Sequence, residues 1–393
     1  MQGGFGMDKN LLNTVISRRN SDSVKWNRYE DDVLPLWVAD MDFPTPEVVI
    51  EAMKERLDHP FFGYPAEVEG LRESICAWLY TRYEWKVNPD EIVMMPGVVN
   101  GLNWVAQTLV DEKQSLIFQT PVYHPFFEIA ANASVNQIHS PLKSRGDRFE
   151  MDFSDLENKI QENTRLFILC NPHNPVGRVY SRQELVRLAE LCEAKDLWIC
   201  SDEIHCDIVY PGSRHTPISS LSESIASRTV TLMAPSKTFN IPGLNFSFAV
   251  VPSEEFRERL KQSRKGIMGH PGLLAYYAAR AAYTEGGGWL DELLLYLDKN
   301  RSFVIDFLQS RMPGIKLFIP EGTYLFWLGC KQMKLKPDPY HFFLENARVA
   351  LNDGRIFGTE GEGFVRLNFA CPMSILETAL DRMADAVNKW GGH

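Results

Sequence analysis

Residues 165–170 (RLFILC), 181–195 (SRQELVRLAELCEAK) and 197–201 (LWICS) decide the fold of this chain. The two outer runs are almost continuously apolar, which is typical of strands buried on both faces of a sheet. The middle run repeats apolar residues with helical spacing, and Ser181 with Glu184 forms a capping box at its start. A strand, a helix and a second strand in succession predict a parallel sheet covered by helices.

Other stretches of the chain extend this pattern. Three further apolar runs of strand length lie at residues 115–119, 229–233 and 246–251. We therefore expect an α/β fold in which residues 43–284 form a large domain around a mainly parallel sheet.

The pattern changes near residue 285. Three consecutive glycines at 286–288 interrupt it, and a long helical stretch follows at residues 289–309. Short strand-like runs alternate with another helical pattern afterwards, which predicts a smaller α+β domain over residues 285–393. Residues 1–42 stand apart from the helix–strand rhythm, and we expect them to pack on the small domain or on a partner subunit.

The composition is that of an ordinary globular enzyme. The chain has 393 residues, of which 45% are hydrophobic and 23% charged, and its formal net charge is −10. These values exclude a mostly disordered chain, and the acidic balance argues against nucleic acid or an anionic membrane as the main partner. The seven cysteines contain no CxxC spacing, which favours reduced thiols in a cytoplasmic protein.

Targeting signals are not predicted. The N-terminus lacks a basic segment followed by an apolar stretch, and the least polar long run, residues 272–283, is too short to span a bilayer. We expect residues 1–6 to be a lead-in to a natural start at Met7.

Four chemically informative side chains stand just beyond the ends of predicted strands: Tyr123, Asn174, Asp202 and Lys237. Because ligands of parallel sheets bind at the carboxyl ends of the strands, we expect these side chains to meet in one crevice. The pKa of a lysine falls readily when it is desolvated, so a lysine at a buried strand end can act as nucleophile or base. This combination favours an aldehyde cofactor that the lysine binds as a Schiff base.

The motifs around these residues resemble a known superfamily. NPHNPVG at 171–177, SDEIH at 201–205 and APSKTFN at 234–240 resemble the fold-type I pyridoxal-phosphate enzymes of aminotransferase class I/II. WVADMDF at 37–43, together with APSKTFN, is similar to the MalY/PatB cystathionine β-lyases (cysteine C–S lyases) within that superfamily. The resemblance extends from about residue 24 to residue 380. It implies the fold-type I architecture and pyridoxal 5′-phosphate as cofactor.

The resemblance also implies a role for each residue of the crevice. Lys237 would bind the cofactor covalently and move the substrate's Cα proton, and Asp202 would pair with the protonated pyridine nitrogen. Asn174 would donate to the phenolic oxygen of the ring, and Tyr123 would stack on its face. The residues alone leave alternatives: a helix-capping Asp202, a turn-forming Asn174 and core packing of Tyr123. His205, where many aminotransferases have a tyrosine, would donate to the phenolic oxygen or be a structural histidine.

The cofactor phosphate needs hydrogen-bond donors. Gly97, Val98 and Val99 open a helical pattern, and backbone N–H groups at a helix start bind anions. Ser236 adds a hydroxyl group. Tyr64 matches a tyrosine that the family supplies from the neighbouring subunit, so the resemblance implies a homodimer with shared sites.

One position departs from the aminotransferase pattern. Asn245 stands eight residues after Lys237, where many aminotransferases place a phosphate-binding arginine. A neutral amide cannot give the bidentate charged contact of an arginine. What replaces that arginine is left open, and the departure weighs against aminotransferase activity.

The substrate carboxylate has its own candidate residues. Arg366 matches the arginine that grips the α-carboxylate in this family, and its planar fork suits that group. Asn174 and the backbone of Ala39 would line the same pocket.

The activity that the resemblance implies is a pyridoxal-phosphate-dependent carbon–sulfur β-lyase. It would cleave cystathionine or related cysteine S-conjugates to a thiol such as homocysteine, pyruvate and ammonia, in the cytoplasm. Two alternatives are an aminotransferase of amino acids and a pyridoxal-phosphate-binding regulator that acts by protein contact. A metal site at Asp202, His205 and Cys206 is disfavoured, because the surrounding residues suit an organic cofactor.

Overall fold

The computed structural model describes residues 11–263 and 265–391. Within them, seven strands form a sheet in the order β2-β10-β9-β8-β7-β3-β4. These strands are β2 (Ile92–Met95), β3 (Ser115–Thr120), β4 (Asn136–Pro141), β7 (Thr164–Cys170), β8 (Trp198–Asp202), β9 (Thr229–Met233) and β10 (Ser247–Val250). Neighbours from β9 to β4 pair in parallel, whereas β10 pairs antiparallel with β9 and β2. The prediction of a mainly parallel sheet is confirmed.

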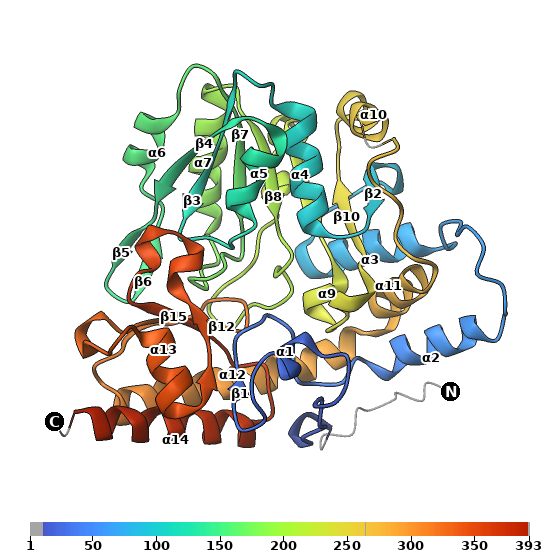
Figure 1. Cartoon of the computed structure of the whole chain (residues 1–393). Helices are drawn as coiled ribbons and strands as arrows, with labels where there is room; N and C mark the ends of the chain where they lie inside the picture. The colour runs from blue at the N-terminus through green and yellow to red at the C-terminus, as the bar shows by residue number, and fades with distance from the viewer. Residues whose placement is uncertain (1–10, 264, 392–393) are drawn as a thin grey trace.

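Helices cover both faces of this sheet, which explains why its strands are apolar throughout. Leu166 and Ile168 of β7 belong to one apolar cluster with residues of α4 (Val98–Leu109), α5 (Phe126–Ala133) and α10 (Glu254–Ser263). Phe167 belongs to another cluster with residues of α6 (Phe153–Lys159) and α7 (Arg182–Ala194), so the helices lie on opposite faces of the sheet (Figure 1). α7 begins with the predicted capping box, because the Glu184 N–H donates to Ser181 Oγ. The helices of this part are α2 (Glu47–Leu57), α3 (Leu71–Tyr83), α4 (Val98–Leu109), α5 (Phe126–Ala133), α6 (Phe153–Lys159), α7 (Arg182–Ala194), α8 (Glu223–Ser227), α9 (Pro235–Thr238), α10 (Glu254–Ser263) and α11 (Leu273–Glu285).

A second, antiparallel sheet lies in the C-terminal part, in the order β11-β12-β15-β14. Its strands are β11 (Lys316–Phe318), β12 (Leu325–Gly329), β14 (Asn352–Asp353) and β15 (Phe364–Asn368). The accompanying helices are α12 (Gly287–Arg311), α13 (Pro339–Phe342) and α14 (Met373–Trp390), and α14 lies along the lower edge of the view in Figure 1. α12 corresponds to the helical stretch expected at 289–309.

The chain passes from α11 to α12 through Gly286. A Cβ atom there would lie 2.5 Å from the Ala282 carbonyl oxygen and 2.5 Å from a ring carbon of Phe239, so only glycine fits this close approach. We propose this turn as the boundary between a large domain at 43–284 and a small domain at 285–393.

The N-terminal segment lies against the C-terminal part. β1 (Leu34–Pro35) pairs in parallel with β13 (Val349–Ala350). The short helix α1 (Val24–Asn27) precedes β1 in the chain. The remaining strands, β5 (Lys143–Arg145) and β6 (Arg148–Glu150), form an antiparallel pair. In the ranges 11–263 and 265–391, none of the helices combines the length and apolar character needed to cross a membrane. The lead-in expected at residues 1–6 lies outside the described residues.

Candidate active site

Four neighbouring strands bring the predicted crevice residues to one edge of the large sheet. Tyr123 follows β3, Asn174 follows β7, Asp202 ends β8, and Lys237 lies on α9 just after β9. The Tyr123 N–H donates to the Asn174 carbonyl over 3.1 Å, which joins the first two ends. The Asn171 N–H donates to the Asp202 carbonyl over 2.9 Å, which joins the next two. The parallel topology therefore gathers these residues as expected.

Lys237 lies in the short helix α9, which begins at Pro235. Pro235 occupies a first-turn position of α9, where its missing N–H has no cost. The Lys237 Nζ donates to the Ala39 carbonyl over 2.6 Å, and the neighbouring Thr238 hydroxyl donates to Asp207 Oδ2 over 2.8 Å. Burial lowers the pKa of Lys237 to about 8, against the opposing charge of Asp40. A substantial fraction of this amine is thus neutral, and nucleophilic, near neutral pH.

Asp202 is a buried carboxyl group. Its Oδ1 accepts the Ile204 N–H over 3.1 Å, and the residues that follow β8 form turns, so Asp202 caps no helix there. Burial raises the pKa of Asp202 to about 7, and the charge of Glu203 acts in the same direction, whereas Lys237 opposes it. A nearby cation would bring this pKa down and keep the carboxyl ionised.

Arg366 on β15 reaches across to the large sheet. Its Nη1 donates to Asn174 Oδ1 over 2.9 Å, and its Nη2 donates to the Trp37 carbonyl at 2.9 Å and to Asn352 Oδ1 at 2.5 Å. Its Nε is buried without a hydrogen-bond partner, and burial lowers the pKa of the guanidinium to about 10. Because Asn174 Oδ1 is engaged, the side-chain group that remains on this amide is the Nδ2 donor.

His205 and Tyr324 border the same space. Their rings meet edge to face with centroids 5.7 Å apart. The Nδ1 of His205 is buried without a partner, and burial, helped by the charges of Lys237 and Arg366, holds the pKa of this histidine well below its usual value. His205 is therefore a neutral imidazole whose buried Nδ1 has no hydrogen-bond partner.

The expected phosphate donors lie at the start of α4 and on α9. Gly97 has φ +133°, and its N–H donates to Ser247 Oγ over 2.9 Å. Val98 and Val99 form the first turn of α4, where backbone N–H groups have no partner within the helix. Ser236 is buried on α9 beside Lys237.

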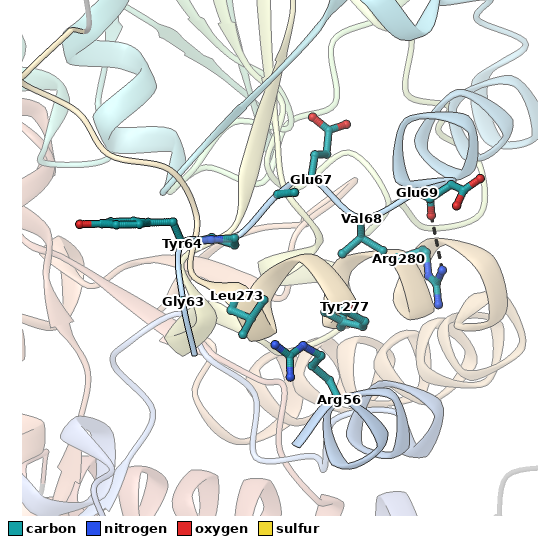
Figure 2. Close-up of a pocket in the computed structure, with 11 residues that line it drawn as sticks. Arg56, Gly63, Tyr64, Glu67, Val68, Glu69, Leu273, Tyr277 and Arg280 are labelled. Atoms are coloured by element: carbon teal, nitrogen blue, oxygen red, sulfur yellow. Dashed lines mark hydrogen bonds between the residues drawn. The ribbon is translucent and has the colours of Figure 1, made fainter. Parts of the chain in front are cut away.

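Asn245 and Tyr64 lie on the outside of the chain. Asn245 is exposed with φ +51° after a 3₁₀ turn. Tyr64 has 106% relative exposure, and Figure 2 shows its ring pointing away from Arg56, Tyr277 and Arg280, with which it lines a surface pocket. Within one chain, the structure thus does not bring Tyr64 together with the other predicted site residues.

The family model described as aminotransferase class I and II matches residues 31–383, which include every predicted site residue. The chain belongs to this family.

Two proteins named as cystathionine beta-lyases and one solved structure are similar to this chain over almost its full length. Cystathionine beta-lyase PatB of Bacillus subtilis is 40% identical, covering 94% of this chain and 98% of that protein. Cystathionine beta-lyase of Corynebacterium glutamicum is 33% identical, covering 94% and 98%. Cystalysin from Treponema denticola, whose crystal structure contains pyridoxal 5′-phosphate, superposes with a TM-score of 0.93 at 35% identity, covering 96% and 99%.

Several residues that border the crevice were not predicted from the sequence. Tyr324 donates to the Ala39 carbonyl over 3.0 Å, Asn352 binds Arg366, and the charge of Asp40 acts on Lys237. Asp40 lies within the WVADMDF motif, so a signal existed for it. Tyr324 and Asn352 lie in ordinary strand-like surroundings and carried no such signal.

Proposed function

We propose that this chain is a pyridoxal-phosphate-dependent carbon–sulfur β-lyase. Its substrates are cystathionine or related cysteine S-conjugates, and its products are a thiol such as homocysteine, pyruvate and ammonia. The observation that carries this proposal is the meeting of Lys237, Asp202 and Arg366 at one sheet edge, in a chain 40% identical to a cystathionine beta-lyase.

The residues present fit this cofactor. The buried carboxyl of Asp202, with its pKa raised to about 7, suits a cationic pyridine nitrogen that would pair with it. The Nδ1 of His205 is buried and unpartnered, and Asn174 offers Nδ2, so both suit the phenolic oxygen. Val98, Val99 and Ser236 would hold the phosphate, whereas the N–H of Gly97, predicted with them, already donates to Ser247 Oγ. When bound, pyridoxal phosphate supplies an electron sink for the charge that develops at the substrate's Cα.

The chain's own residues orient the substrate and move its proton. Arg366, with a buried free Nε and Asn174 beside it, binds the α-carboxylate. This contact fixes the Cα–H bond relative to Lys237. The Nζ of Lys237, once it is released as a free amine, then accepts the Cα proton, because its lowered pKa leaves part of that amine neutral near neutral pH. Tyr123, half-buried beside Asn174, would stack on one face of the cofactor ring.

A homodimer with shared sites belongs to this proposal. Tyr64 and its neighbours Phe61 and Phe62 are all strongly exposed in the single chain, which suits a segment that enters a second copy. In such a dimer, the Tyr64 hydroxyl would donate to the cofactor phosphate of the partner's site and so compensate for the neutral Asn245.

We place the enzyme in the cytoplasm. All seven cysteines have free thiols, and six of them are buried. A reducing compartment suits unpaired thiols of this kind.

The deciding experiment incubates the purified protein with cystathionine and no oxo acid and follows pyruvate and free thiol. A β-lyase forms both in equal amounts, and Lys237→Ala serves as the inactive control. An aminotransferase would consume cystathionine only after an oxo acid is added. A purely regulatory binding protein would do neither, and a pulldown from cell extract would then identify its partner.

A further inference from the structure

Residues 38–41 form a segment whose successive carbonyl groups are all held by side chains. Asn368 Nδ2 binds the carbonyls of Val38 and Asp40, each at 2.7 Å. Asn240 Nδ2 binds the Met41 carbonyl at 3.0 Å, and its Oδ1 accepts the Met41 N–H at 3.0 Å. The segment is therefore clamped from both the small sheet and the residues that follow Lys237.

The Ala39 carbonyl, in the middle of this segment, points at the catalytic lysine. It accepts the Lys237 Nζ at 2.6 Å and the Tyr324 hydroxyl at 3.0 Å. This carbonyl oxygen stabilises the ammonium form of Lys237 more than the neutral amine, because the N–H groups of the ammonium carry more positive charge.

Two cations earlier in the chain, Arg18 and Lys25, bind the carboxylates of Asp40 and Asp42 and the backbone carbonyls of residues 40 and 41. Arg18 donates from Nη2 to Asp40 Oδ2 at 2.7 Å and from Nη1 to Asp42 Oδ1 at 2.9 Å. The fully buried Lys25 donates to Asp42 Oδ2 at 2.8 Å and to the Asp40 carbonyl at 3.1 Å. Burying such a network is costly and seldom adds net stability, so specific placement is the better explanation for it.

One oxygen of this network has no hydrogen-bond partner. Asp40 Oδ1 is buried without one, and the nearest recorded cation, Lys25 Nζ, lies 3.6 Å from it. The charge of Asp40 raises the pKa of Lys237 and is the largest influence that opposes burial.

Other groups also face Lys237 from the surrounding elements. Asp202 on β8 acts in the same direction as Asp40, and Arg366 on β15 acts against it. Burial keeps His205 neutral by lowering its pKa and keeps Tyr324 protonated by raising its pKa. Asp40 is thus the strongest anionic influence on the lysine.

We infer that Asp40 is a positioning residue for Lys237, and that its carboxylate and the Ala39 carbonyl stabilise the ammonium formed when Lys237 accepts a proton. In that step the substrate's Cα–H bond breaks, an N–H bond forms on Lys237, and the electron pair stays with the carbon. Arg18 and Lys25 hold Asp40 in place. The role of Asp40 in catalysis rests on the proposed β-lyase activity. Its effect on the pKa of Lys237 does not depend on that activity and can be measured separately.

The test measures that proton affinity in the cofactor-free protein, without substrate. Lysines are reductively methylated with ¹³C-formaldehyde, and the Lys237 signal is identified by its loss in Lys237→Ala and titrated by NMR. Asp40→Asn should lower the pKa of Lys237 by about one unit or more, since an adjacent opposite charge favours the charged form by that amount. Arg18→Gln should raise the pKa of Lys237, because Asp40 loses a cation that neutralises its charge while Lys25 still holds Asp40 in place. Asp40→Glu should restore most of the lost affinity.

The matched control is Asp31→Asn, which removes the same charge from an exposed side chain of the same segment and should leave the titration unchanged. A Lys237 pKa that is unaltered in Asp40→Asn, or equally altered in Asp31→Asn, overturns the inference. A lower Lys237 pKa in Arg18→Gln also overturns the inference, because it would show that the network only supports the fold. If Asp40→Asn does not fold, the sign in Arg18→Gln decides alone. Pyruvate formation, measured separately, tests the β-lyase proposal and has no bearing on this result.

Discussion

The guanidinium of Arg366 donates from Nη1 to Oδ1 of Asn174 over 2.9 Å, although 192 residues separate the two in the sequence. This bond joins the small sheet to the edge of the large one and sets which side-chain atom of Asn174 faces the crevice. It therefore links the proposed carboxylate contact to the proposed cofactor contact.

Replacing Arg366 with lysine keeps the positive charge and removes the planar guanidinium group that can bind a carboxylate through two N–H groups. We expect Arg366→Lys to raise the KM for cystathionine roughly 10- to 100-fold, because a charged hydrogen bond contributes about 1.5–3 kcal/mol. Steady-state kinetics at saturating cofactor measure this change. An unchanged KM would show that Arg366 acts only as a bridge to Asn174.

Lys237→Ala removes both the nucleophile and the proton acceptor. We expect the variant to bind pyridoxal phosphate reversibly and to lose turnover by several orders of magnitude. In the native protein, borohydride reduction should attach the cofactor to the peptide that contains Lys237, as mass spectrometry would show. Attachment at a different lysine would contradict the site.

Asp202 should make the stability of the cofactor-free protein depend on pH. Its folded pKa of about 7 lies above the ordinary value of 3.8, so the stability that its protonated form contributes is full below about pH 4 and is lost as pH rises through 7. The loss is on the order of 4 kcal/mol at most. Urea denaturation at pH 5 and pH 8 should show this loss in the native sequence and not in Asp202→Asn. Parallel pH profiles would mean that the carboxyl is already paired.

Lys237 does not obscure that measurement. Its folded pKa of about 8 lies below the ordinary 10.5, so it costs stability below pH 8 and that cost disappears as pH rises toward 10.5. Most of its change therefore falls above the interval in which Asp202 titrates. With cofactor bound, Asp202→Asn should keep the cofactor and show a large fall in kcat.

Tyr64→Phe should loosen cofactor binding by about 0.5–1.5 kcal/mol, or up to about 3 for a charged acceptor, if its hydroxyl reaches the partner's phosphate. Fluorescence titration with pyridoxal phosphate measures this change.

Mixing inactive Lys237→Ala with inactive Tyr64→Ala tests the same sharing directly. The mixed dimer holds one site with both defects and one with neither, so part of the activity should return. No recovery after verified subunit exchange would place Tyr64 outside the partner's site.

Local patterns predicted much of the large sheet correctly. The run at 229–233 is β9 with the same limits, and the helix after Ser181 starts at its capping box. Continuous burial of both faces of a strand needs an apolar side chain at every position, so this signal is strong in the sequence. The direction of β10 was not predicted, because an apolar run of that length suits either orientation of a buried strand.

Four of the proposed site residues were placed by a general rule of parallel sheets. Tyr123, Asn174, Asp202 and Lys237 follow successive strands, and parallel pairing brings such ends to one edge. Arg366 was assigned only by resemblance, because it lies on a different sheet.

The sequence by itself determined the α/β class, the strands that build the crevice and the residue types that the chemistry needs, since these depend on neighbours within a few positions. Only the tertiary structure decided that the Ala39 carbonyl lies 2.6 Å from the Lys237 Nζ and that Arg18 and Lys25 bind the next residue, Asp40. These contacts join segments far apart in the chain. Their energies depend on burial and on distances between charges, which no local pattern contains.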